Sequence, residues 1–422
     1  MKASEVLKRL SSGEMIPLLR EIYSENIDEQ VLRYKEAIQS FMDYYGDQDI
    51  MIFSVPGKCE IGGNHTDHQQ GRVLASAIQL DSIGIVGKQN RYVKVIYNEL
   101  NINEIDTENI KYNEAKKGTM ESLINGVLFG LNQKNYHIGG FNAYIQCDIP
   151  RNVGLGSSAN FNIMIGTIIN YLYNEGKIEN KYLVQIGRFA TNIFYCKPSG
   201  LMNECVCCVG GFIKVDFRDP NSPDIYKLNT DFSNFDYTLC CVNSNVCRSD
   251  NTIDYDAIPK EMIKVANFFK KDVLRDVSYD EFMKNYRIVR ARVGDRPALR
   301  ALHFFKEEDR VLKQTEALEK GDFDTFLKLV RESGDSTFKA LQNIYPQEST
   351  RHQNIGTAIV LSENFLGEDG VVKVNGGGFS STMIAFVKTS VINDYAAYMD
   401  SIFGKGSCYI IHTREQGAIR LL

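Results

Sequence analysis

The segment PRNVGLGSSA, residues 150–159, lies between two apolar stretches of different periodicity. Residues 141–149 before it alternate like a β-strand, and the stretch from Asn160 to Tyr173 after it has the spacing of an α-helix. Gly154 and Gly156 allow the backbone to come close to a ligand. Two serines follow at the start of the expected helix, where free N–H groups and the helix dipole favour phosphate oxygens. The segment therefore predicts a phosphate-binding loop.

Other interpretations of this loop remain open from its residues alone. It lacks the Gly-Lys-Ser/Thr ending of a Walker loop, and its single spaced pair of glycines does not make a G-x-G-x-x-G motif. It could be an ordinary helix start, in which serine caps the helix and glycine turns the chain. If the loop does bind phosphate, a serine hydroxyl could also reach a Mg²⁺ ion.

Two further segments are candidates for the same site. Residues 375–381, NGGGFSS, place three consecutive glycines between two expected strands. This is either a tight turn with a bulge or a backbone that passes close to the loop or its ligand. Residues 62–68, GGNHTDH, can hydrogen-bond a polyhydroxylated ligand, or they form a solvated turn. A metal site on His65 and His68 is disfavoured, because neither a helix frame nor a third ligand accompanies them.

In this order and spacing, the three segments resemble the three motifs of the GHMP kinases, and galactokinase is the member of that family with the greatest likeness. Residues 56–68, PGKCEIGGNHTDH, are similar to the first motif, P-G-R-x-x-x-x-G-E-H-T-D-Y. Residues 150–159 match the second motif, P-x-x-x-G-L-x-S-S-A, in full. Residues 376–381, GGGFSS, match the third, G-x-G-F-x-[GS]. The resemblance extends over residues 33–411.

The resemblance implies a two-lobed α+β fold with its active site in the cleft between the lobes. The expected N-terminal lobe, residues 1–215, has a ribosomal-protein-S5-like element and carries the sugar site and the phosphate loop. The expected C-terminal lobe, residues 216–422, is a ferredoxin-like α+β unit. The implied cofactors are ATP and Mg²⁺, and the implied reaction moves the γ-phosphoryl group of ATP to the anomeric hydroxyl of galactose or a related sugar. A monomer is also expected.

The resemblance assigns roles to particular positions. Lys58 and Asn203 are the expected catalytic positions. The expected substrate-binding residues are Asn64, His65, Asp67, Gly200 and Tyr255. The expected ATP-binding residues are Gly154, Leu155, Gly156, Ser157, Ser158, Ala159, Gly376, Gly377 and Gly378. Ser158 and Thr191 occupy the positions expected to face the metal ion.

Four of these positions depart from the galactokinase pattern. The catalytic Asp of the segment G-[IL]-M-D-Q is Asn203 in the present sequence, and the first-motif Arg is Lys58. The Glu that contacts the sugar is Asn64, and an acidic Mg²⁺ ligand aligns with Thr191. A lysine keeps the positive charge but loses the bidentate fork of arginine. A threonine removes a negative ligand, so Mg²⁺ should bind more weakly.

Two functions are compatible with this pattern. One is an ATP-dependent sugar kinase, because phosphoryl transfer depends mainly on positioning and charge stabilisation and can survive the loss of a base. The other is a catalytically impaired homologue, or pseudokinase, that binds sugar or ATP as a sensor or regulator. Asn203 and Thr191 favour the second function, whereas the retained Asp67 and Tyr255 favour a sugar-like ligand. Glu204 could replace Asn203 as the base, although adjacent helical residues point about 100° apart.

Composition narrows the class of protein. The chain has 422 residues, a net charge of -5 and no basic cluster, so nucleic acid is not an expected partner. Its first residues have no signal-peptide pattern, and it contains no run of about 18 apolar residues that would predict a membrane span. We therefore expect a cytoplasmic protein with reduced thiols. The cluster Cys205, Cys207 and Cys208 lacks a second ligand pair, so buried packing is favoured over structural zinc.

The remaining sequence predicts helices in the first fifty residues and mixed strands and helices thereafter. The apolar run 49–57 predicts a strand that ends at Pro56 and Gly57, and residues 73–86 predict a strand, a turn and a second strand. Few β-α-β signals occur, which favours an α+β fold over a doubly wound sheet.

Overall fold

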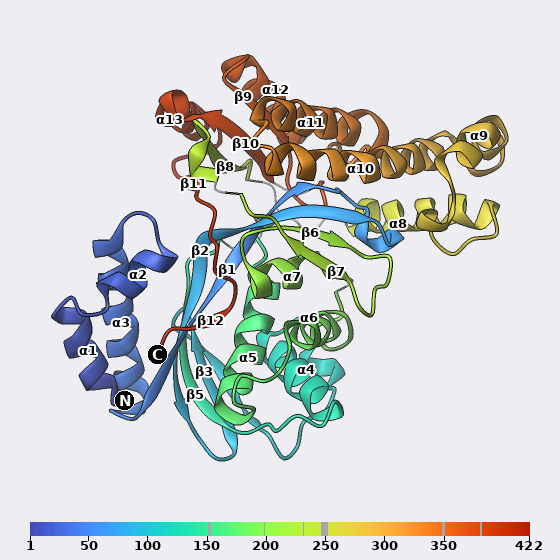
Figure 1. Ribbon diagram of the computed structural model, residues 1–422. Coiled ribbons are helices and arrows are strands. Elements are labelled where there is room, and N and C mark those ends of the chain that lie inside the picture. Colours follow the sequence, from blue (N-terminus) through green and yellow to red (C-terminus); the bar gives the residue numbers. More distant parts are fainter. Residues whose placement is uncertain (151–152, 198, 231, 246–251, 348–350, 380–381) are drawn as a thin grey trace.

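Two β-sheets, each covered by helices, build the two lobes of the molecule (Figure 1). The computed structural model describes residues 1–150, 153–197, 199–230, 232–245, 252–347, 351–379 and 382–422. The mixed α+β architecture that the sequence predicts is confirmed. The lobe boundary at residues 215 and 216 remains a prediction.

The first sheet contains eight strands among the described residues, and β3 and β5 are its parallel pair. Along the sheet the order is β12-β1-β2-β5-β3-β4, and β6 pairs with β2 and with β7. The strands are β1 (Ile50–Gly62), β2 (Arg72–Lys88), β3 (Tyr92–Tyr97), β4 (Leu100–Asp106), β5 (Phe141–Cys147), β6 (Phe212–Asp216), β7 (Asp224–Lys227) and β12 (Ile419–Arg420).

Helices cover both faces of this sheet (Figure 1). One face packs against α1 (Ala3–Ser11), α2 (Ile16–Ile22) and α3 (Ile27–Tyr45). The other packs against α4 (Met120–Gln133), α5 (Ser157–Tyr173), α6 (Asn180–Phe189) and α7 (Met202–Val209). Helix α6 continues into a π-helical turn, η3 (Ala190–Phe194), which carries Thr191 into the site described below.

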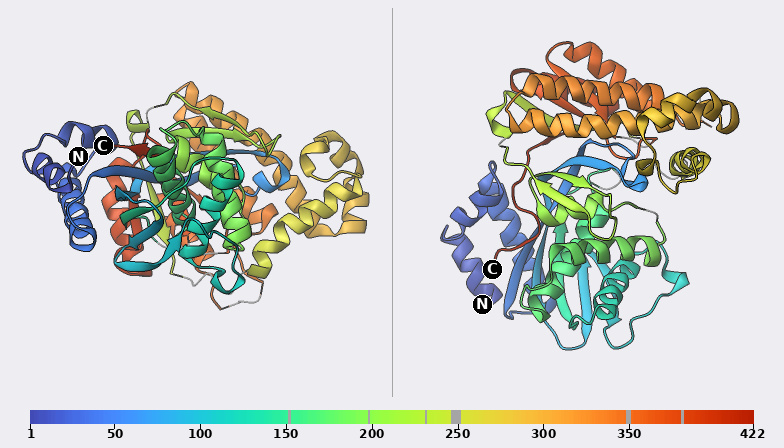
Figure 2. Two further views of the ribbon diagram at one scale, coloured as in Figure 1. Left: turned by 90° about the horizontal axis from the view of Figure 1, so that it is seen from below. Right: turned by 45° about the vertical axis from the view of Figure 1, so that its right-hand side comes forward.

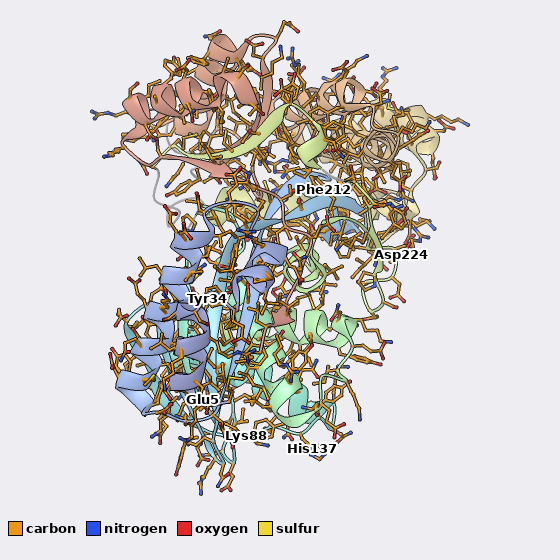
Figure 3. All side chains as sticks on the ribbon, turned by 60° about the vertical axis from the view of Figure 1, so that its left-hand side comes forward. Glu5, Tyr34, Lys88, His137, Phe212 and Asp224 are labelled. Atoms are coloured by element: carbon orange, nitrogen blue, oxygen red, sulfur yellow. The ribbon has the colours of Figure 1, made fainter. Side chains whose placement is uncertain are left out.

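Helix α3 shows how the sequence fixes this packing. Its buried residues Tyr34, Ala37, Ile38 and Phe41 recur at the three- and four-residue spacing that makes one apolar face. That face meets the sheet, and Figure 3 shows Tyr34 on the helical layer beside the strands. The helices predicted for the first fifty residues are therefore confirmed.

The second sheet has the order β11-β8-β10-β9, and its neighbours are antiparallel. Its strands are β8 (Tyr237–Asn243), β9 (Gly370–Val374), β10 (Thr382–Lys388) and β11 (Cys408–Ile411). Helices α11 (Phe323–Ser336), α12 (Asn354–Leu366) and α13 (Ile392–Phe403) pack with this sheet. Helices α8 (Thr252–Phe268), α9 (Tyr279–Val293) and α10 (Asp295–Glu319) form an arm that extends to the side in Figure 2.

Short turns of helix complete the described structure. The 3₁₀ turns are η1 (Asp67–Gln69), η2 (Glu114–Lys116), η4 (Phe232–Asn234), η6 (Leu274–Asp276) and η8 (Thr389–Val391). A second π-helical turn, η7 (Thr337–Leu341), ends α11.

The β1–β2 hairpin differs from the sequence prediction. The predicted end of the first strand at Pro56 and Gly57 is wrong, as is the predicted turn within residues 73–86. Both strands run through, because the register shifts between Pro56 and Gly57 and the resulting bulge absorbs the Pro-Gly pair. The long hairpin consequently carries its tip, residues 63–71, up to helices α8 and α10 (Figure 1).

The chain crosses back to the first sheet after β11. The red trace in Figure 1 runs from the second sheet to β12, which pairs with β1. On this path Arg414 donates hydrogen bonds to Asp81 (2.9 Å) and to Ser54 Oγ (2.8 Å), and all three side chains are fully buried or nearly so. Arg33 of α3 pairs with the same Asp81 at 2.7 Å. One carboxylate therefore joins the helical layer, the sheet and the returning segment.

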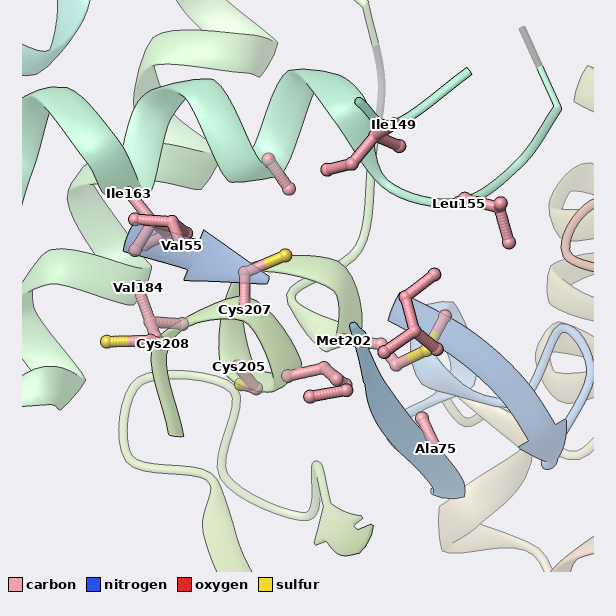
Figure 4. Close-up of a cluster of buried hydrophobic side chains, with 14 of the residues drawn as sticks. Val55, Ala75, Ile149, Leu155, Ile163, Val184, Met202, Cys205, Cys207 and Cys208 are labelled. Carbon is pink, nitrogen blue, oxygen red and sulfur yellow. The ribbon is translucent and has the colours of Figure 1, made fainter. Parts of the chain in front are cut away.

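The cysteines of α7 pack in an apolar cluster. Figure 4 shows Cys205, Cys207 and Cys208 with Met202 among aliphatic side chains such as Val55 and Val184. Within the part of the chain that the structure describes, no group of three His, Cys, Asp or Glu side chains is placed to hold a metal ion. The described helices also include none that is long and apolar enough to cross a membrane.

Candidate active site

The three sequence motifs meet at one cavity of about 540 Å³. Its walls come from the tip of the β1–β2 hairpin, the start of α5, the segment 197–204, helix α8 and the turn that precedes β10. Among the predicted site residues, all but Leu155 line it: Lys58, Asn64, His65, Asp67, Gly154, Gly156, Ser157, Ser158, Ala159, Thr191, Gly200, Asn203, Tyr255, Gly376, Gly377 and Gly378.

Leu155 has a different place from its neighbours in the loop. Its side chain is 1% exposed and belongs to the largest hydrophobic core cluster among the described residues. Its carbonyl oxygen accepts a hydrogen bond from the backbone N–H of Lys58 at 3.0 Å. Leu155 thus anchors the loop to β1, while Gly154 and Gly156 face the cavity.

The Gly/Ser loop has the geometry of an anion site. Gly154 and Gly156 have φ values of 73° and 86°, in the left-handed region that favours glycine. Helix α5 begins at Ser157 with no side chain capping its first N–H groups, so the alternative of a serine-capped helix start is not what the structure contains. Ser157, Ser158 and Ala159 line the cavity at this helix end. Their free N–H groups and the helix dipole favour a negatively charged ligand.

Lys58 brings a positive charge to the same end of α5. A Cβ atom on Gly156 would lie 2.8 Å from Lys58 Cγ, so the missing side chain makes room for the lysine. Lys58 is only 3% exposed, lines the cavity and forms no ion pair with any residue in the described ranges. A buried ammonium group without a carboxylate partner is costly unless an anion neutralises it.

The tip of the hairpin is hydrogen-bonded to the glycine turn of the second lobe, residues 376–378. His65 Nε2 lies 2.9 Å from the carbonyl oxygen of Gly377, and Asn64 Nδ2 donates to that of Gly376 at 2.6 Å. Asn64 also donates to Glu60 Oε1 at 2.5 Å and accepts from Asn343 Nδ2 at 2.8 Å. Each polar atom of the Asn64 side chain therefore already has a protein partner.

Residues of α10 and α11 also hold the hairpin tip in place. Glu307 Oε1 accepts a hydrogen bond from the backbone N–H of Gly63 at 3.1 Å and from Ser333 Oγ at 2.6 Å. Burial alone would raise the pKa of Glu307, but Arg310, His303 and Lys373 outweigh it and lower the pKa to about 2. Glu307 is thus a fixed anion that positions the first motif.

Asp67 lies against Gly200 from the opposite wall. A Cβ atom on Gly200 would be 1.6 Å from Asp67 Oδ2, so the close approach requires glycine at this position. Burial raises the pKa of Asp67 and lowers the pKa of its neighbour His65. Tyr255 packs its ring on His65, with ring centroids 5.4 Å apart, and passes over Gly377. An acidic group, an imidazole and an aromatic face thus share one part of the cavity.

Asn203 and Thr191 complete the set of departures from the family pattern. Asn203 is in the first turn of α7, and its Oδ1 is buried without a partner among the described residues. Thr191 Oγ1 accepts from Asn162 Nδ2 at 2.8 Å and donates to the carbonyl oxygen of Gly187 at 3.2 Å. The Thr191 hydroxyl is consequently occupied by protein partners.

The sequence analysis did not assign roles to several lining residues. Glu204, considered only as a substitute for Asn203, lines the same cavity, because the first turn of α7 faces it end-on. The other unassigned lining residues are Glu60, Gly63, Val73, Lys197, Ser199, Met202, Asp256 and Phe379. Glu60 and Gly63 belong to the first motif, so their position in the sequence was the available signal.

Comparison with known proteins shows which families this chain resembles. Residues 122–211 match the family model "GHMP kinases N terminal domain", and residues 39–88 match "Galactokinase galactose-binding signature". Over these residues the chain is accordingly similar to the GHMP kinases, and within that family it resembles galactokinase.

Individual relatives agree with this placement. A galactokinase of Streptococcus suis is 27% identical over 361 residues, which span 83% of this chain and 88% of the relative. The crystal structure of Lactococcus lactis galactokinase complexed with galactose superposes with a TM-score of 0.77 at 20% identity, over 90% of this chain and 98% of that one. The mevalonate kinase of Methanococcus jannaschii superposes with a TM-score of 0.61 at 17% identity, over 86% and 98%. At these identities the two structures establish the shared fold.

Proposed function

We propose that the protein transfers the γ-phosphoryl group of ATP to the anomeric hydroxyl of galactose or a related sugar. The observation that carries this proposal is the shared cavity. Lys58, which has no ion-pair partner among the described residues, and the uncapped start of α5 face the same space as Asp67 and Tyr255. One part of the lining suits phosphate oxygens, and another suits a polyhydroxylated ring.

The proposed reaction needs little covalent chemistry from the protein. The anomeric oxygen attacks the γ-phosphorus, the new O–P bond forms, and the bond to the β–γ bridging oxygen breaks as ADP leaves. The N–H groups at Ser157, Ser158 and Ala159 hold the phosphate oxygens, and Lys58 stabilises the negative charge that develops between donor and acceptor. Positioning and charge stabilisation supply most of the catalysis in this class of reaction.

Mg²⁺ would enter this site with the nucleotide. A Mg²⁺ ion keeps several waters and commonly binds phosphate oxygens with few protein ligands, so the lack of an acidic cluster in the described residues is compatible with it. The Ser158 hydroxyl lies at the start of α5 and fits such a ligand. Thr191 does not fit, because its hydroxyl is uncharged and already paired with Asn162 and Gly187. When bound, the ion would neutralise charge on the transferred group.

The sugar would be held by Asp67, His65 and Tyr255. Asp67 can accept hydrogen bonds from sugar hydroxyls, and the aromatic ring of Tyr255 offers an apolar face. Asn64 takes a different part in this proposal from the direct contact that the resemblance implies. Since its amide is bonded to Glu60, Gly376 and Asn343, it shapes the pocket through the two turns.

A second candidate function has its own support. Asn203 cannot accept a proton, and Thr191 is not available as a ligand, so a homologue that binds sugar or ATP without turnover is the alternative. Such a pseudokinase would act as a sensor or regulator.

One assay separates the two functions. ATP consumption is measured with Mg²⁺ and a panel of galactose, N-acetylgalactosamine, glucose and mevalonate, and thermal shifts are recorded on the same samples. Turnover with a sugar supports the kinase. A thermal shift with ATP or sugar but no turnover supports the binding protein. The absence of both turnover and thermal shifts would contradict both functions. Size-exclusion chromatography of the same samples tests the expected monomer.

A further inference from the structure

Helix α7 presents to the cavity a carboxyl group that has one unpaired oxygen among the described residues. Glu204 lies next to Asn203 in the first turn of α7 and is 1% exposed. Its Oε2 has no hydrogen-bond partner among the described residues. Its stem runs close to α6, where a Cβ atom on Gly187 would lie 3.1 Å from Glu204 Cγ. The glycine leaves the space in which the carboxyl group is held.

The Oε2 atom of this carboxyl group has no hydrogen bond within the described part of the fold. Buried carboxyl groups normally have ion-pair or hydrogen-bond partners, and leaving an oxygen unpaired in an enclosed site is unfavourable. Asp81 and Glu307, elsewhere in the chain, follow that rule with arginine partners. A polar atom kept unpaired and facing a ligand cavity is instead typical of a group whose partner is the ligand.

The other carboxylates of the cavity are differently placed. Glu60 Oε1 accepts from Asn64 Nδ2, and Asp67 Oδ1 accepts from the backbone N–H of His68 at 2.9 Å. Asp256 is half exposed and pairs with Lys260 on the same helix at 3.6 Å. Asn203 has no proton-accepting group of useful basicity. Of these side chains, Glu204 is the one with a carboxylate oxygen that remains buried, lines the cavity and is unpaired within the described residues.

The surroundings also give Glu204 a suitable basicity. Burial raises its pKa to about 8, and a backbone hydrogen bond, Arg188 of α6 and Lys58 of β1 offset part of that rise. Asp67 of η1 adds to the rise, and Cys205 and Cys207 of α7 are neutral neighbours, because burial raises the pKa of both thiols. A base is most effective when its pKa lies near the working pH.

We propose that Glu204 is the general base of the kinase, in place of an acidic residue at position 203. It takes the proton from the attacking sugar hydroxyl as the oxygen bonds to the γ-phosphorus of ATP. The electron pair of the broken P–O bond leaves with ADP, and Glu204 afterwards returns the proton to water. This inference rests on the proposed function and names the group that completes it.

The test compares wild-type protein with Glu204→Gln in the sugar panel across pH. Glutamine matches the shape and hydrogen-bonding reach of the neutral acid, so the variant keeps the packing against Gly187, and a thermal melt verifies its folding. The expected result is a fall in kcat of about 10²–10⁴-fold with unchanged thermal shifts for ATP and sugar. The wild-type kcat/KM should rise with pH toward a plateau above an apparent pKa near 8, and this limb should be absent from the variant.

A matched control and three outcomes decide the matter. Glu363→Gln on α12 removes a carboxyl group whose pKa is also raised by desolvation, but it lies outside the cavity and should leave kcat and its pH profile unchanged. A Glu204→Gln variant with kcat within about threefold of wild type would overturn the proposal, since a base contributes far more. A higher Mg²⁺ requirement with full kcat at saturating Mg²⁺ would also overturn it and assign a ligand role. A wild-type protein that turns over no acceptor would overturn the proposed function and this inference together.

Discussion

The backbone of Gly200 and the carboxylate of Asp67 are in such close contact that no side chain fits between them. A Cβ atom at position 200 would stand 1.6 Å from Asp67 Oδ2. The segment before α7 and the tip of the β1–β2 hairpin are therefore set against each other at the cavity wall. The position of Asp67 depends on a residue far away in the sequence.

Gly200→Ala should displace Asp67 and weaken the sugar step. A displacement of about 1 Å at a reacting centre can cost roughly 10²-fold, so we expect a loss of that order in kcat/KM for the sugar. The KM for ATP should change little, because the loop at 154–159 is on another wall. Steady-state kinetics with each substrate varied in turn measures both. Asp67→Asn, which keeps the volume, is the matched control, and an equal loss of ATP affinity in Gly200→Ala would contradict the assignment.

Lys58→Met should impair the chemical step. The change keeps the stem that packs at Gly156 and removes the charge, so we expect kcat at saturating ATP to fall by about 10²–10³-fold. Because the free protein no longer buries an unpaired ammonium group, its melting temperature should hold or rise. Lys264→Met, at an exposed position on α8, is the control for loss of a lysine. A kcat close to wild type would remove Lys58 from the mechanism.

Thr191→Val tests whether the threonine hydroxyl has a structural role rather than a role as a metal ligand. Valine keeps the shape but deprives Asn162 Nδ2 of an acceptor, while the bond from Asn162 to the Gly187 carbonyl at 3.0 Å remains. We expect the free energy of unfolding to fall by about 1 kcal/mol, as for one lost buried hydrogen bond. The Mg²⁺ concentration for half-maximal rate should stay the same. A marked increase in that concentration would show that the hydroxyl does bind the ion.

Asn203→Asp should partly restore activity to Glu204→Gln. Both side chains line the cavity from the first turn of α7, so a carboxylate at 203 can reach the same ligand. We expect a gain of at least about tenfold in kcat over the single variant, within the range of base catalysis. Asn203→Ser on the same background is the control, because it changes the position without adding a base. Equal rates for the two double variants would argue that position 203 has no access to the attacking hydroxyl.

Glu204 should also make stability depend on pH. Its pKa is about 8 in the folded protein, against 4.5 as the ordinary value, so the folded state binds the extra proton between these limits. The stability it contributes is complete below pH about 4.5 and is lost as the pH rises through about 8. Above pH 8, Glu204→Gln should therefore be more stable than wild type by a few kcal/mol, since each pKa unit corresponds to about 1.4 kcal/mol.

Chemical denaturation of both proteins at pH 5, 7 and 9 measures this difference. Comparing the two proteins at each pH cancels the contributions of groups such as His65 and Glu307 that both retain. A stability difference that does not grow with pH would show that Glu204 is not buried as an isolated acid.

The meeting of the three motifs could be predicted from the sequence through the resemblance to the GHMP kinases, and the glycines in each motif allow the close backbone approach that this requires. The start of α5 and the polar hairpin tip are local features, and both are confirmed. The long course of β1 through Pro56 and Gly57 could not be predicted, because local turn signals were outweighed by pairing with β2 along almost its whole length. Local periodicity carries no information about such a partner.

The placement of both Asn203 and Glu204 at the cavity could not be predicted either, because it also depends on tertiary contacts. Neighbouring helical residues point about 100° apart, so Asn203 and Glu204 were not expected to share one site. They do so because the helix directs its first turn, rather than one side, at the cavity. The space that Gly187 leaves for Glu204 is a tertiary contact between α6 and α7. Sequence spacing within α7 could not reveal either fact.

The return of the chain to the first sheet has a consequence for biosynthesis. Strand β1 can pair with β12, and Asp81 with Arg414, only after more than three hundred further residues have been translated. Consider a nascent chain in which only the first-lobe residues before β8 have left the ribosome. Asp81 would then have Arg33 but not Arg414 as an ion-pair partner, and the edge of β1 that pairs with β12 would be unpaired. The first lobe therefore cannot complete its folding before the segment that follows β11 has been made.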